Sequence, residues 1–570
     1  MRILLLTHAF NSLAQRLFIE LRERGHDVTV ELDINDAVTH EAIELAAPDL
    51  VIAPFLKRAI AEAVWRQVPC FIVHPGIRGD RGPSSLDWAL LDAEPVWGVT
   101  VLQAEAEMDA GPVWASCEFP MRDAAKSSIY RDEVTAAAVA AVLEAVDRFT
   151  QGSFTPQRIG PAEGVRGRAR PAMLQADRAI DWSSDTTARV LTKIRSGDGN
   201  PGVRDQMFDR TVHLYNAKPA AGLNGPPGAV LARSGPAIAR ATIDGAVWIG
   251  HLREPAGEHP FKLPATHVLA GEVAGLAAVP VDAAAGFGEI AYREAGAVGL
   301  LHFDFYNGAM GTEASRRLLA AYRMATERPT KVIVLLGGTE FWSNGMDLNL
   351  IEASRSPADE SWANINALDD LAEAIVRTRS HLTVAAVSGN AGAGGVFLAR
   401  TADLVWLRDG VVLNPHYKDM GNLFGSELWT YLLPRRAGAA AARNVTEARL
   451  PIGGAEAVAL GLADDSIAVA TRSDFTRAVI ARAEALAAEP GWSLRIVGKA
   501  RLRDADEAEK SLALYRAEEL EQMRRNFYGF DPSYHVARSN FVRKVAKSRT
   551  PVTIARHRDR RCRFPRRIAS

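Results

Sequence analysis

Short apolar runs that alternate with amphipathic stretches mark residues 1–160. Apolar residues at every third or fourth position predict helices at Leu13–Arg24, Ala59–Arg66 and Val134–Phe149. Strands are expected at Ile3–Leu6, Val28–Leu32, Leu50–Ala53, Cys70–Val73 and Trp97–Gln103. Strands alternating with helices predict an α/β fold, here a doubly wound parallel sheet with ligands at the carboxyl ends of its strands.

A different pattern follows a stretch rich in Gly, Pro and Arg at about 151–171, which is expected to be a linker. Residues 170–263 contain one short amphipathic stretch, Thr187–Ile194, and several short apolar runs between Gly/Pro turns. The strands expected there are Val212–Asn216, Ala229–Ala232, Ala237–Ile243 and Ala246–Ile249. This pattern predicts a small β-barrel domain, followed by an Ala-rich linker at 264–296.

The alternation of strands and helices returns at 297–545 and predicts a second α/β domain. Its expected strands are Val298–Phe305, Lys331–Leu336, Thr383–Val387, Asp403–Leu407 and Val411–Asn414. Its expected helices are Glu313–Met324, Trp362–Arg379, Gly394–Ala399 and Glu507–Asn526. The repeated strand and helix pattern again places candidate ligand sites in the loops that follow the strands.

The end of the chain is strongly basic. Between Arg543 and Arg567 there are 11 Lys or Arg residues and a single acid, Asp559. Apolar periodicity is weak from Arg556 onward, so residues 546–570 are expected to form a solvated, partly disordered tail. A phosphate-binding arm is the alternative.

Length and composition narrow the class of protein. At roughly 150 residues per domain, the 570 residues predict three or four domains. The net charge of -1 gives no field that favours nucleic acid or an anionic membrane. The first apolar run is too short for a signal peptide, and no run approaches the length of about 18 apolar residues needed to span a membrane. Neither nucleic acid nor a membrane is expected as a partner.

The three cysteines lie far apart, at Cys70, Cys117 and Cys562, without a Cys-x-x-Cys pair or a His/Cys cluster. This spacing predicts neither a disulfide framework nor a zinc site, and no metal is expected. Unpaired cysteines fit a reducing cytoplasm.

Candidate chemistry begins where the strand Cys70–Val73 is expected to end. His74 opens a Gly/Pro-rich loop, and Asp109 stands in a turn after the strand Trp97–Gln103. A histidine oriented by a carboxylate can shuttle a proton and stabilise the tetrahedral intermediate of formyl transfer. His74 and Asp109 are therefore the candidate catalytic pair. A satisfied core histidine beside a turn aspartate is the alternative.

The sequence around this pair resembles the formyltetrahydrofolate-dependent formyltransferases and hydrolases, which include methionyl-tRNA formyltransferase. The matching segments are His74, Arg81-Gly82-Pro83, Trp97-Gly98-Val99-Thr100-Val101, Met108-Asp109-Ala110-Gly111 and, further on, Ile180-Asp181-Trp182. The resemblance implies catalytic roles for His74 and Asp109 and places Arg81, Gly82 and Pro83 near the folate. The family usually carries Asn two residues before the histidine, where this chain has Ile72.

Two glycine-containing loops in the third domain form a second candidate site. The first is Ser343-Asn344-Gly345-Met346-Asp347-Leu348 and the second runs from Gly389 to Gly395. Gly-rich turns let backbone N–H groups approach a carbonyl oxygen, which is what an oxyanion hole requires. The two loops resemble those of the crotonase (enoyl-CoA hydratase/isomerase) superfamily, and this resemblance implies a crotonase-like α/β spiral for residues 297–545. The resemblance implies a CoA site in which the amides of Met346 and Gly394 are the oxyanion donors and Ser343 belongs to the first loop.

The two glutamates that hydratases of this superfamily use are missing. Phe397 stands at the first position and His416 or Tyr417 at the second, so hydration of a double bond is not expected. Glu427 follows ten residues after Tyr417, where some members carry an acid or base. The candidate catalytic residues here are Tyr417 and Glu427. A charge at a helix N-terminus is the alternative interpretation of Glu427.

The combination of both parts resembles the HypX (HoxX) family of [NiFe]-hydrogenase maturation factors over essentially the whole chain. This resemblance implies that carbon monoxide is made from formyltetrahydrofolate by formyl transfer to coenzyme A and decarbonylation of formyl-CoA. The implied cofactors are tetrahydrofolate and coenzyme A. From their positive charge, Arg543, Lys544 and Lys547 are candidates for contact with the phosphates of coenzyme A, and a solvated surface is the alternative. The implied partners are small-molecule substrates and hydrogenase maturation proteins or the hydrogenase precursor.

Two other functions compete with this interpretation. One is a bifunctional tailoring enzyme that formylates an amino sugar at the first site and processes an acyl-CoA at the second. The other is a non-catalytic scaffold that binds metabolites and docks on a hydrogenase precursor through its basic tail. The sequence leaves open whether the two sites share one cavity.

Overall fold

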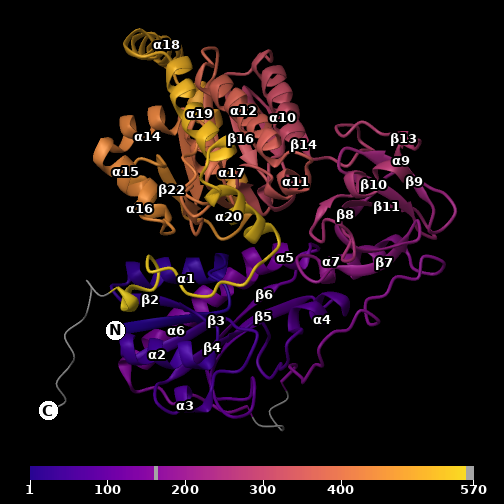
Figure 1. The fold of residues 1–570 in the computed structure, drawn as a ribbon, viewed down its shortest axis with the longest axis vertical. Coiled ribbons are helices and arrows are strands. Elements are labelled where there is room, and N and C mark those ends of the chain that lie inside the picture. The colour runs from indigo at the N-terminus through magenta and orange to yellow at the C-terminus, as the bar shows by residue number, and fades with distance from the viewer. Residues whose placement is uncertain (160–164, 560–570) are drawn as a thin grey trace.

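The protein is described by a computed structural model over residues 1–159 and 165–559. Three parts are visible in Figure 1: an N-terminal α/β part at the bottom, a β-rich part at the right, and a C-terminal α/β part at the top. Among the described residues, no helix is both long and apolar enough to cross a membrane.

A six-stranded sheet with the order β2-β1-β3-β4-β5-β6 forms the centre of the N-terminal part. Its strands are β1 (Arg2–Thr7), β2 (Asp27–Leu32), β3 (Leu50–Phe55), β4 (Cys70–His74), β5 (Val96–Gln103) and β6 (Val113–Pro120). The first four strands in this order are parallel, as expected. The expectation is wrong for β5, which is antiparallel to both β4 and β6. The connection 104–112 between β5 and β6 is too short for the crossover of about a dozen residues that parallel strands require.

Helices cover both faces of this sheet. They are α1 (Ser12–Glu23), α2 (Asp36–Ala46), α3 (Glu62–Trp65), α4 (Ser85–Leu91), α5 (Lys126–Ile129) and α6 (Thr135–Gln151), with a π-helical turn at Tyr130–Val134. Apolar residues of α1 and α6 share one buried core with the sheet, and those of α2 and α3 share another on its opposite face. The helix expected at Ala59–Arg66 is shorter than predicted.

The second part is one sheet of seven strands. These are β7 (Val203–Met207), β8 (Arg210–Pro219), β9 (Val230–Ser234), β10 (Ala237–Ala241), β11 (Ala246–Arg253), β12 (Leu263–Pro264) and β13 (Ala277–Ala278). Hydrogen bonds follow the order β13-β9-β10-β11-β8-β7, and β12 pairs with β11. Helix α7 (Thr187–Gly197) packs on this sheet, and its Val190 and Ile194 are fully buried.

The linker expected at 264–296 is wrong at both ends. Helices α8 (Ala265–Val268) and α9 (Ala270–Val273) carry Leu269 and Val273 into the core of the second part. At the other end, β14 (Ile290–Ala295) pairs antiparallel with β15 and opens the sheet of the third part. Leu269 and Val273 fold onto the second part because burying them removes apolar area from water. β14 joins the third part through its strand pairing with β15.

The third part contains a six-stranded sheet in the order β14-β15-β16-β18-β20-β22 and a three-stranded sheet in the order β17-β19-β21. The remaining strands are β15 (Val298–Phe303), β16 (Val332–Gly337), β17 (Phe341–Ser343), β18 (Leu382–Val387), β19 (Asn390–Gly392), β20 (Leu404–Arg408), β21 (Leu413–Asn414) and β22 (Asp465–Ile467). Each strand of the small sheet follows a strand of the large one. This repeat is the α/β spiral expected for the domain.

Helices surround these sheets. They are α10 (Thr312–Thr326), α11 (Leu348–Ala353), α12 (Pro357–Val376), α13 (Gly394–Arg400), α14 (Trp429–Ala437), α15 (Ala439–Glu447), α16 (Gly454–Ala459), α17 (Arg472–Ala488), α18 (Trp492–Glu509), α19 (Leu512–Tyr528) and α20 (Ser533–Val542). The single helix expected at Glu507–Asn526 is wrong, because α18 ends at Glu509 and α19 begins at Leu512. Ser511 caps α19 by accepting a hydrogen bond from the amide of Leu514 at 3.2 Å.

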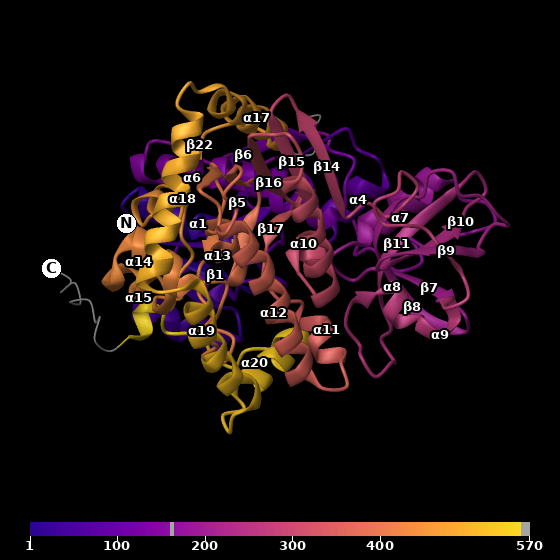
Figure 2. The same cartoon turned by 90° about the horizontal axis from the view of Figure 1, so that it is seen from above.

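The third part rests on the N-terminal part and covers much of it when seen from above (Figure 2). Ion pairs join the two. Asp132 in the π-helical turn pairs with Arg408 at 2.8 Å and with Arg472 at 2.7 Å. Arg131, beside it, pairs with Glu340. π-helical turns are frequent at functional sites, and this one lies at the junction of two parts.

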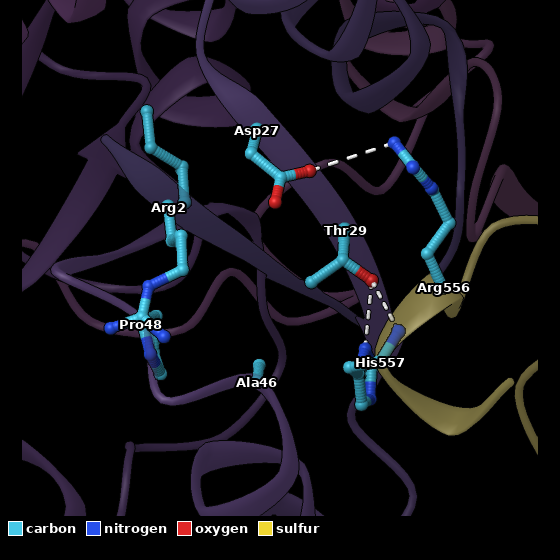
Figure 3. A pocket seen from close by; sticks show the side chains of 8 residues that line it. Arg2, Asp27, Thr29, Ala46, Pro48, Arg556 and His557 are labelled. Carbon is cyan, nitrogen blue, oxygen red and sulfur yellow. Dashed lines mark hydrogen bonds and ion pairs between the residues drawn. The ribbon is translucent and has the colours of Figure 1, made fainter. Parts of the chain in front are cut away.

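The end of the chain returns to the N-terminal part, so the solvated tail expected at 546–570 is wrong for its described portion. The amide of Val30 donates to the carbonyl of Ile554 at 3.0 Å, and Ile554 joins the core beneath β2. His557 also contacts Thr29, as Figure 3 shows beside a small hollow on the surface of the sheet. Residues 560–570, which include Cys562, lie outside the described residues.

A buried carboxylate explains why the tail docks. Glu31 on β2 is fully buried, and it lies 2.8 Å from Nε2 of His557 and 2.7 Å from Nε of Arg558. Burial raises the pKa of Glu31, but hydrogen bonds from His557, Thr550 and Arg558 outweigh burial and bring the pKa below its ordinary value. A buried charge without such partners would be strongly destabilising.

Replacing Glu31 by Gln is expected to release the tail. Removal of one partner from a buried ion pair costs about 3–5 kcal/mol, so amide hydrogen exchange at 550–558 should accelerate strongly at pH 7. Because the folded pKa of Glu31 is depressed, its stabilising effect is present above the unfolded pKa of about 4.3 and is lost as the pH falls through the folded pKa. The difference from wild type should therefore shrink in acid. The exposed Glu44→Gln change is the control, and equal protection of 550–558 in both variants would contradict this account.

Candidate functional site

His74 ends β4 with its side chain buried, and two groups hold its Nε2 atom. Oδ2 of Asp80 lies 3.1 Å away and the hydroxyl of Ser85 lies 3.2 Å away. A hydrogen bond from one ring nitrogen to a carboxylate fixes the tautomer and leaves the other nitrogen free to accept a proton. Asp80 is therefore the carboxylate that orients His74.

Asp109 faces the other ring nitrogen. Its Oδ2 lies 3.6 Å from Nδ1 of His74, which is too long for a hydrogen bond, and it accepts the amide hydrogen of Gly82 at 3.1 Å. Asp109 adopts a left-handed backbone with φ 54°, which Asp tolerates better than most residues. The structure thus brings together the two residues expected to form the pair, with Asp109 beside the unoccupied nitrogen rather than bonded to it.

An arginine from a distant segment supports the orienting carboxylate. Nε of Arg170 donates to Oδ1 of Asp80 at 3.1 Å, and both side chains are buried. The same guanidinium pairs with Asp92 at 2.7 Å and lies over the ring of Trp97. These contacts fix Asp80, and therefore the imidazole, in one position.

The expected folate loop lies next to this pair. Arg81 pairs with Glu107 at 2.5 Å near the surface, and Pro83 is exposed. Gly82 has φ +115°, and a Cβ there would overlap the carbonyl oxygen of Arg170. Ile72 lies two residues before His74 on β4, so it is on the same face of the strand and supplies an apolar neighbour.

The two glycine loops of the third part also meet. A Cβ on Gly345 would lie 3.4 Å from the amide nitrogen of Gly394, which begins α13. Among the described residues, no hydrogen bond is donated by the amides of Met346 and Gly394. These are the amides expected to act as oxyanion donors. Ser343 is fully buried, and its hydroxyl accepts the amide hydrogen of Gly345 at 3.1 Å, so it shapes the loop from inside.

Glu427 and Tyr417 lie against the second loop. The hydroxyl of Tyr417 donates to Oε2 of Glu427 at 2.7 Å. A Cβ on Gly394 would overlap Oε1 of the same carboxyl group, so only glycine leaves room for it. Both side chains are buried. The expected acid or base and the expected tyrosine are thus paired beside a candidate oxyanion donor.

Burial dominates the electrostatics of this pair. Burial, followed by the nearby charge of Asp369, raises the pKa of Glu427 to about 8, against the opposing hydrogen bond from Tyr417. Burial and the Glu427 carboxylate raise the pKa of Tyr417 well above its ordinary value. Catalytic groups often have such displaced pKa values. The carboxyl group can therefore exchange a proton near neutral pH, while the phenol stays protonated.

Phe397 and His416 take different places. Phe397 is fully buried, and its ring stacks on that of Tyr417 with a centroid distance of 5.4 Å and an angle of 18°. His416 directs Nδ1 toward Asp419, 3.7 Å away, instead of toward Glu427. Of the two residues that stand where a hydratase glutamate is expected, Tyr417 is the one that contacts the carboxyl group.

Sequence reasoning missed several residues of both sites. Asp80, Ser85 and Arg170 surround His74, and Asp369 and Glu519 bind the turn that carries Glu427. An acid six residues after the histidine was visible in the first loop, but no spacing identified the others. In the described part of the chain, no group of three His, Cys, Asp or Glu is placed to hold a metal ion.

A polar contact links the surroundings of the two sites. The amide group of Asn414 donates to the side chain of Gln15 on α1 at 3.0 Å. Asn414 also accepts the amide hydrogen of Ala393 at 2.9 Å, next to Gly394. α1 follows the carboxyl end of β1, at the same sheet edge as His74. The second site therefore faces the sheet edge that carries the first.

Two protein families match separate segments of this chain. The family described as "Enoyl-CoA hydratase/isomerase" matches residues 306–530, and the family described as "Formyl transferase, C-terminal domain" matches residues 173–263. Methionyl-tRNA formyltransferase of Dechloromonas aromatica is 27% identical over 250 residues, which cover 43% of this chain and 78% of that protein.

Two relatives match nearly the whole chain. Hydrogenase maturation factor HoxX of Bradyrhizobium diazoefficiens is 57% identical over 561 residues, which cover 98% of both proteins. The crystal structure of HypX from Aquifex aeolicus in complex with tetrahydrofolic acid is 48% identical, with a TM-score of 0.94, and the match covers 98% of this chain and 99% of that one.

The proton on Glu427 can be observed directly. The carboxylic C=O band that is present in wild type and absent in Glu427→Gln should disappear with a midpoint near pH 8, because burial raises the pKa of Glu427 to about 8. Infrared difference spectroscopy over pH 6 to 10 measures it.

Replacing Tyr417 by Phe tests in which direction the hydrogen bond from Tyr417 changes the pKa of Glu427. The hydrogen bond from Tyr417 lowers the pKa of Glu427, so its loss should move the midpoint to higher pH. A wild-type band already absent at pH 6 would contradict the assignment.

Proposed function

The chain belongs to the family of hydrogenase maturation factors that includes HoxX and HypX, and we propose that it makes carbon monoxide from formyltetrahydrofolate through formyl-coenzyme A. Formyltransferase and crotonase-like domains on one chain indicate an enzyme. The observation that supports the proposal most is the buried Glu427–Tyr417 pair against Gly394, because it puts a proton acceptor beside a carbonyl-binding amide.

In the first step, His74 activates the thiol of coenzyme A. Asp80 accepts the Nε2 hydrogen, so Nδ1 takes the thiol proton. The C–S bond forms, the bond between the formyl carbon and N10 breaks, and the proton passes from His74 to N10. The products are formyl-CoA and tetrahydrofolate. Asp109 lies beside Nδ1 and stabilises the imidazolium while it exists.

The folate is assigned to the loop of Arg81, Gly82 and Pro83. It adjoins the His74–Asp109 pair through the hydrogen bond from the amide of Gly82. The related HypX of Aquifex aeolicus is known in complex with tetrahydrofolic acid. The formyltransferase family usually has Asn where this chain has Ile72. The apolar residue fits a thiol nucleophile, since a thiol carries a single proton that His74 alone can take.

In the second step, the amides of Met346 and Gly394 polarise the thioester carbonyl. The carboxylate of Glu427 takes the formyl proton, and the electron pair of the C–H bond stays on carbon. The C–S bond breaks with its electrons on sulfur, Tyr417 assists departure of the thiolate, and the thiolate regains the proton. Carbon monoxide and free coenzyme A leave, so the thiol is recycled.

Exclusion of water decides between carbon monoxide and formate. A hydratase carries a water-activating glutamate where this chain has Phe397, whose ring covers Tyr417. With Phe397 in place of that glutamate, no carboxylate holds water on that side of the thioester, so hydrolysis of formyl-CoA is disfavoured in this site.

The substrates indicate the cellular compartment and the acceptor of the product. Formyltetrahydrofolate and coenzyme A are cytoplasmic metabolites of small size, and we assign the reaction to that compartment. The acceptor of the gas is a hydrogenase precursor or a maturation protein bound to it. Arg543, Lys544 and Lys547 are assigned to the phosphates of coenzyme A. Arg543 also pairs with Glu352 at 3.2 Å and lies over Phe261.

Replacing His74 by Asn should stop the first step. General-base catalysis contributes about 10²- to 10⁴-fold, so CoA-dependent consumption of formyltetrahydrofolate should fall by that factor, as measured by release of tetrahydrofolate. His213→Asn, in the second part of the protein, is the matched control. Unchanged turnover in the His74 variant would favour the scaffold function.

Replacing Glu427 by Gln should separate the two steps. Without the base, formyl-CoA should accumulate while carbon monoxide release falls by about 10²-fold or more, as measured by mass spectrometry and a haemoglobin assay. Glu289→Gln, a buried glutamate paired with Arg317 far from Tyr417, is the control. Loss of carbon monoxide without formyl-CoA would contradict the assigned step.

The tailoring alternative makes a different prediction about coenzyme A. An independent amino-sugar formyltransferase at the first site would consume formyltetrahydrofolate at the same rate with and without coenzyme A. Stimulation of that consumption by coenzyme A excludes it.

A further inference from the structure

The turn that carries Glu427 has an unfavourable backbone conformation. Glu427 and Leu428 are both left-handed, with φ 60° and 61°, and neither is a glycine. Two consecutive residues in this region cost free energy and persist only where surrounding contacts hold them. The contacts come from two helices that are distant in sequence.

Asp369 on α12 binds the first half of the turn. Its Oδ1 accepts the amide hydrogen of Glu427 at 2.8 Å, and its Oδ2 accepts the hydroxyl hydrogen of Ser426 at 2.8 Å. The carboxyl group is fully buried. Nε of Arg516 lies 3.8 Å from Oδ2 and is the cation that faces it.

Glu519 on α19 binds the second half. Its Oε2 accepts the amide hydrogen of Leu428 at 3.0 Å and faces the hydroxyl of Ser426 at 3.2 Å. Its Oε1 accepts the amide hydrogen of Thr430 at 2.8 Å and its hydroxyl hydrogen at 2.5 Å. Glu519 is also fully buried. The two carboxyl groups together accept the amide hydrogens of Glu427, Leu428 and Thr430, while the amide of Trp429 donates within the turn to the carbonyl of Ser426 at 3.4 Å.

We propose that Asp369 and Glu519 are positioning residues for the second step: they hold the left-handed turn that presents the carboxyl group of Glu427 to Tyr417 and Gly394. This inference rests on the proposed function of Glu427. The two residues do not touch the thioester, and they act through the backbone of the turn.

The same arrangement sets the charge of Glu427. The groups that face its carboxyl region are Tyr417, Asp369 and Glu519, with Arg516 behind Asp369. Burial raises the pKa of Asp369 to about 6 and that of Glu519 to about 8. Three buried acids with one partial counter-charge titrate as a coupled set. A negative charge on Asp369 therefore keeps the proton on Glu427.

Asp369→Asn removes the negative charge at this position and keeps the hydrogen bonds to the turn. Asn keeps an oxygen toward the amide of Glu427, and its NH2 faces the hydroxyl of Ser426, which can accept as well as donate. Glu519→Gln does the opposite, because both of its oxygens face backbone N–H groups and an amide can satisfy only one side. The first variant should remove charge and the second should disturb the turn.

The test measures carbon monoxide release by the full-length protein from pH 6 to 9.5. The carboxylate form of Glu427 is active, so release rises with pH. In Asp369→Asn this rise should move to lower pH by about one unit, as expected for loss of a nearby like charge, with the maximal rate within threefold of wild type. In Glu519→Gln the maximal rate should fall at least tenfold at every pH, with the KM for coenzyme A unchanged. Glu289→Gln should change neither.

The infrared band of Glu427 keeps this inference separate from the proposed function. If wild type releases no carbon monoxide, the proposed reaction fails, yet a lower midpoint of the Glu427 band in Asp369→Asn still supports the assigned role. An unshifted band and an unshifted pH profile in that variant, together with a normal rate in Glu519→Gln, would overturn it. Should Glu519→Gln fail to fold, Asp369→Ala replaces it, because Ala removes both acceptors that Asp369 offers to the turn. The maximal rate should then fall at least tenfold at every pH, and a normal rate would overturn the inference.

Discussion

The hydrogen bond between the buried carboxyl group of Glu427 and the hydroxyl of Tyr417 is the interaction on which the rest depends. A carboxyl group in this position is out of water, so its proton is lost only near the pH of the cell. Glycine at position 394 makes room for it, and the ring of Phe397 stacks on that of Tyr417. The left-handed turn that carries Glu427 is bound by the two buried carboxyl groups of Asp369 and Glu519.

Contacts between the N-terminal and third parts fix the position of the first site relative to the second. Parallel strands place their carboxyl ends at one edge, and His74 ends one such strand while α1 follows another. The third part contacts α1 through Gln15 and Asn414, and the π-helical turn through Asp132. The tail closes the arrangement by returning to β2, where Glu31 requires its charged donors. The proposed function requires a reactive thioester to pass from one site to the other, and a fixed junction would favour that transfer.

Much of this organisation was predictable from local patterns. Alternating apolar runs predicted the strand that ends at His74. The resemblance of two glycine loops to the crotonase superfamily, and not the glycine pattern alone, pointed to the amides of Met346 and Gly394. Contacts between distant residues were not predictable. Asp80 meets an arginine 90 residues away, and the turn at Glu427 meets acids 58 and 91 residues away, because folding alone brings them together. The antiparallel β5 and the docked tail were missed for a related reason: pairing partners and buried charges are properties of the folded chain.

The proposed function requires that one formyl carbon passes from folate to coenzyme A and leaves as carbon monoxide. It is tested most directly with formyltetrahydrofolate carrying ¹³C in the formyl group, with the released gas and solution products followed together by infrared and NMR spectroscopy. We expect ¹³CO in an amount equal to the formyltetrahydrofolate consumed, only when coenzyme A is present, with coenzyme A unconsumed at the end. Labelled formate as the product, or ¹³CO formed equally well without coenzyme A, would contradict it.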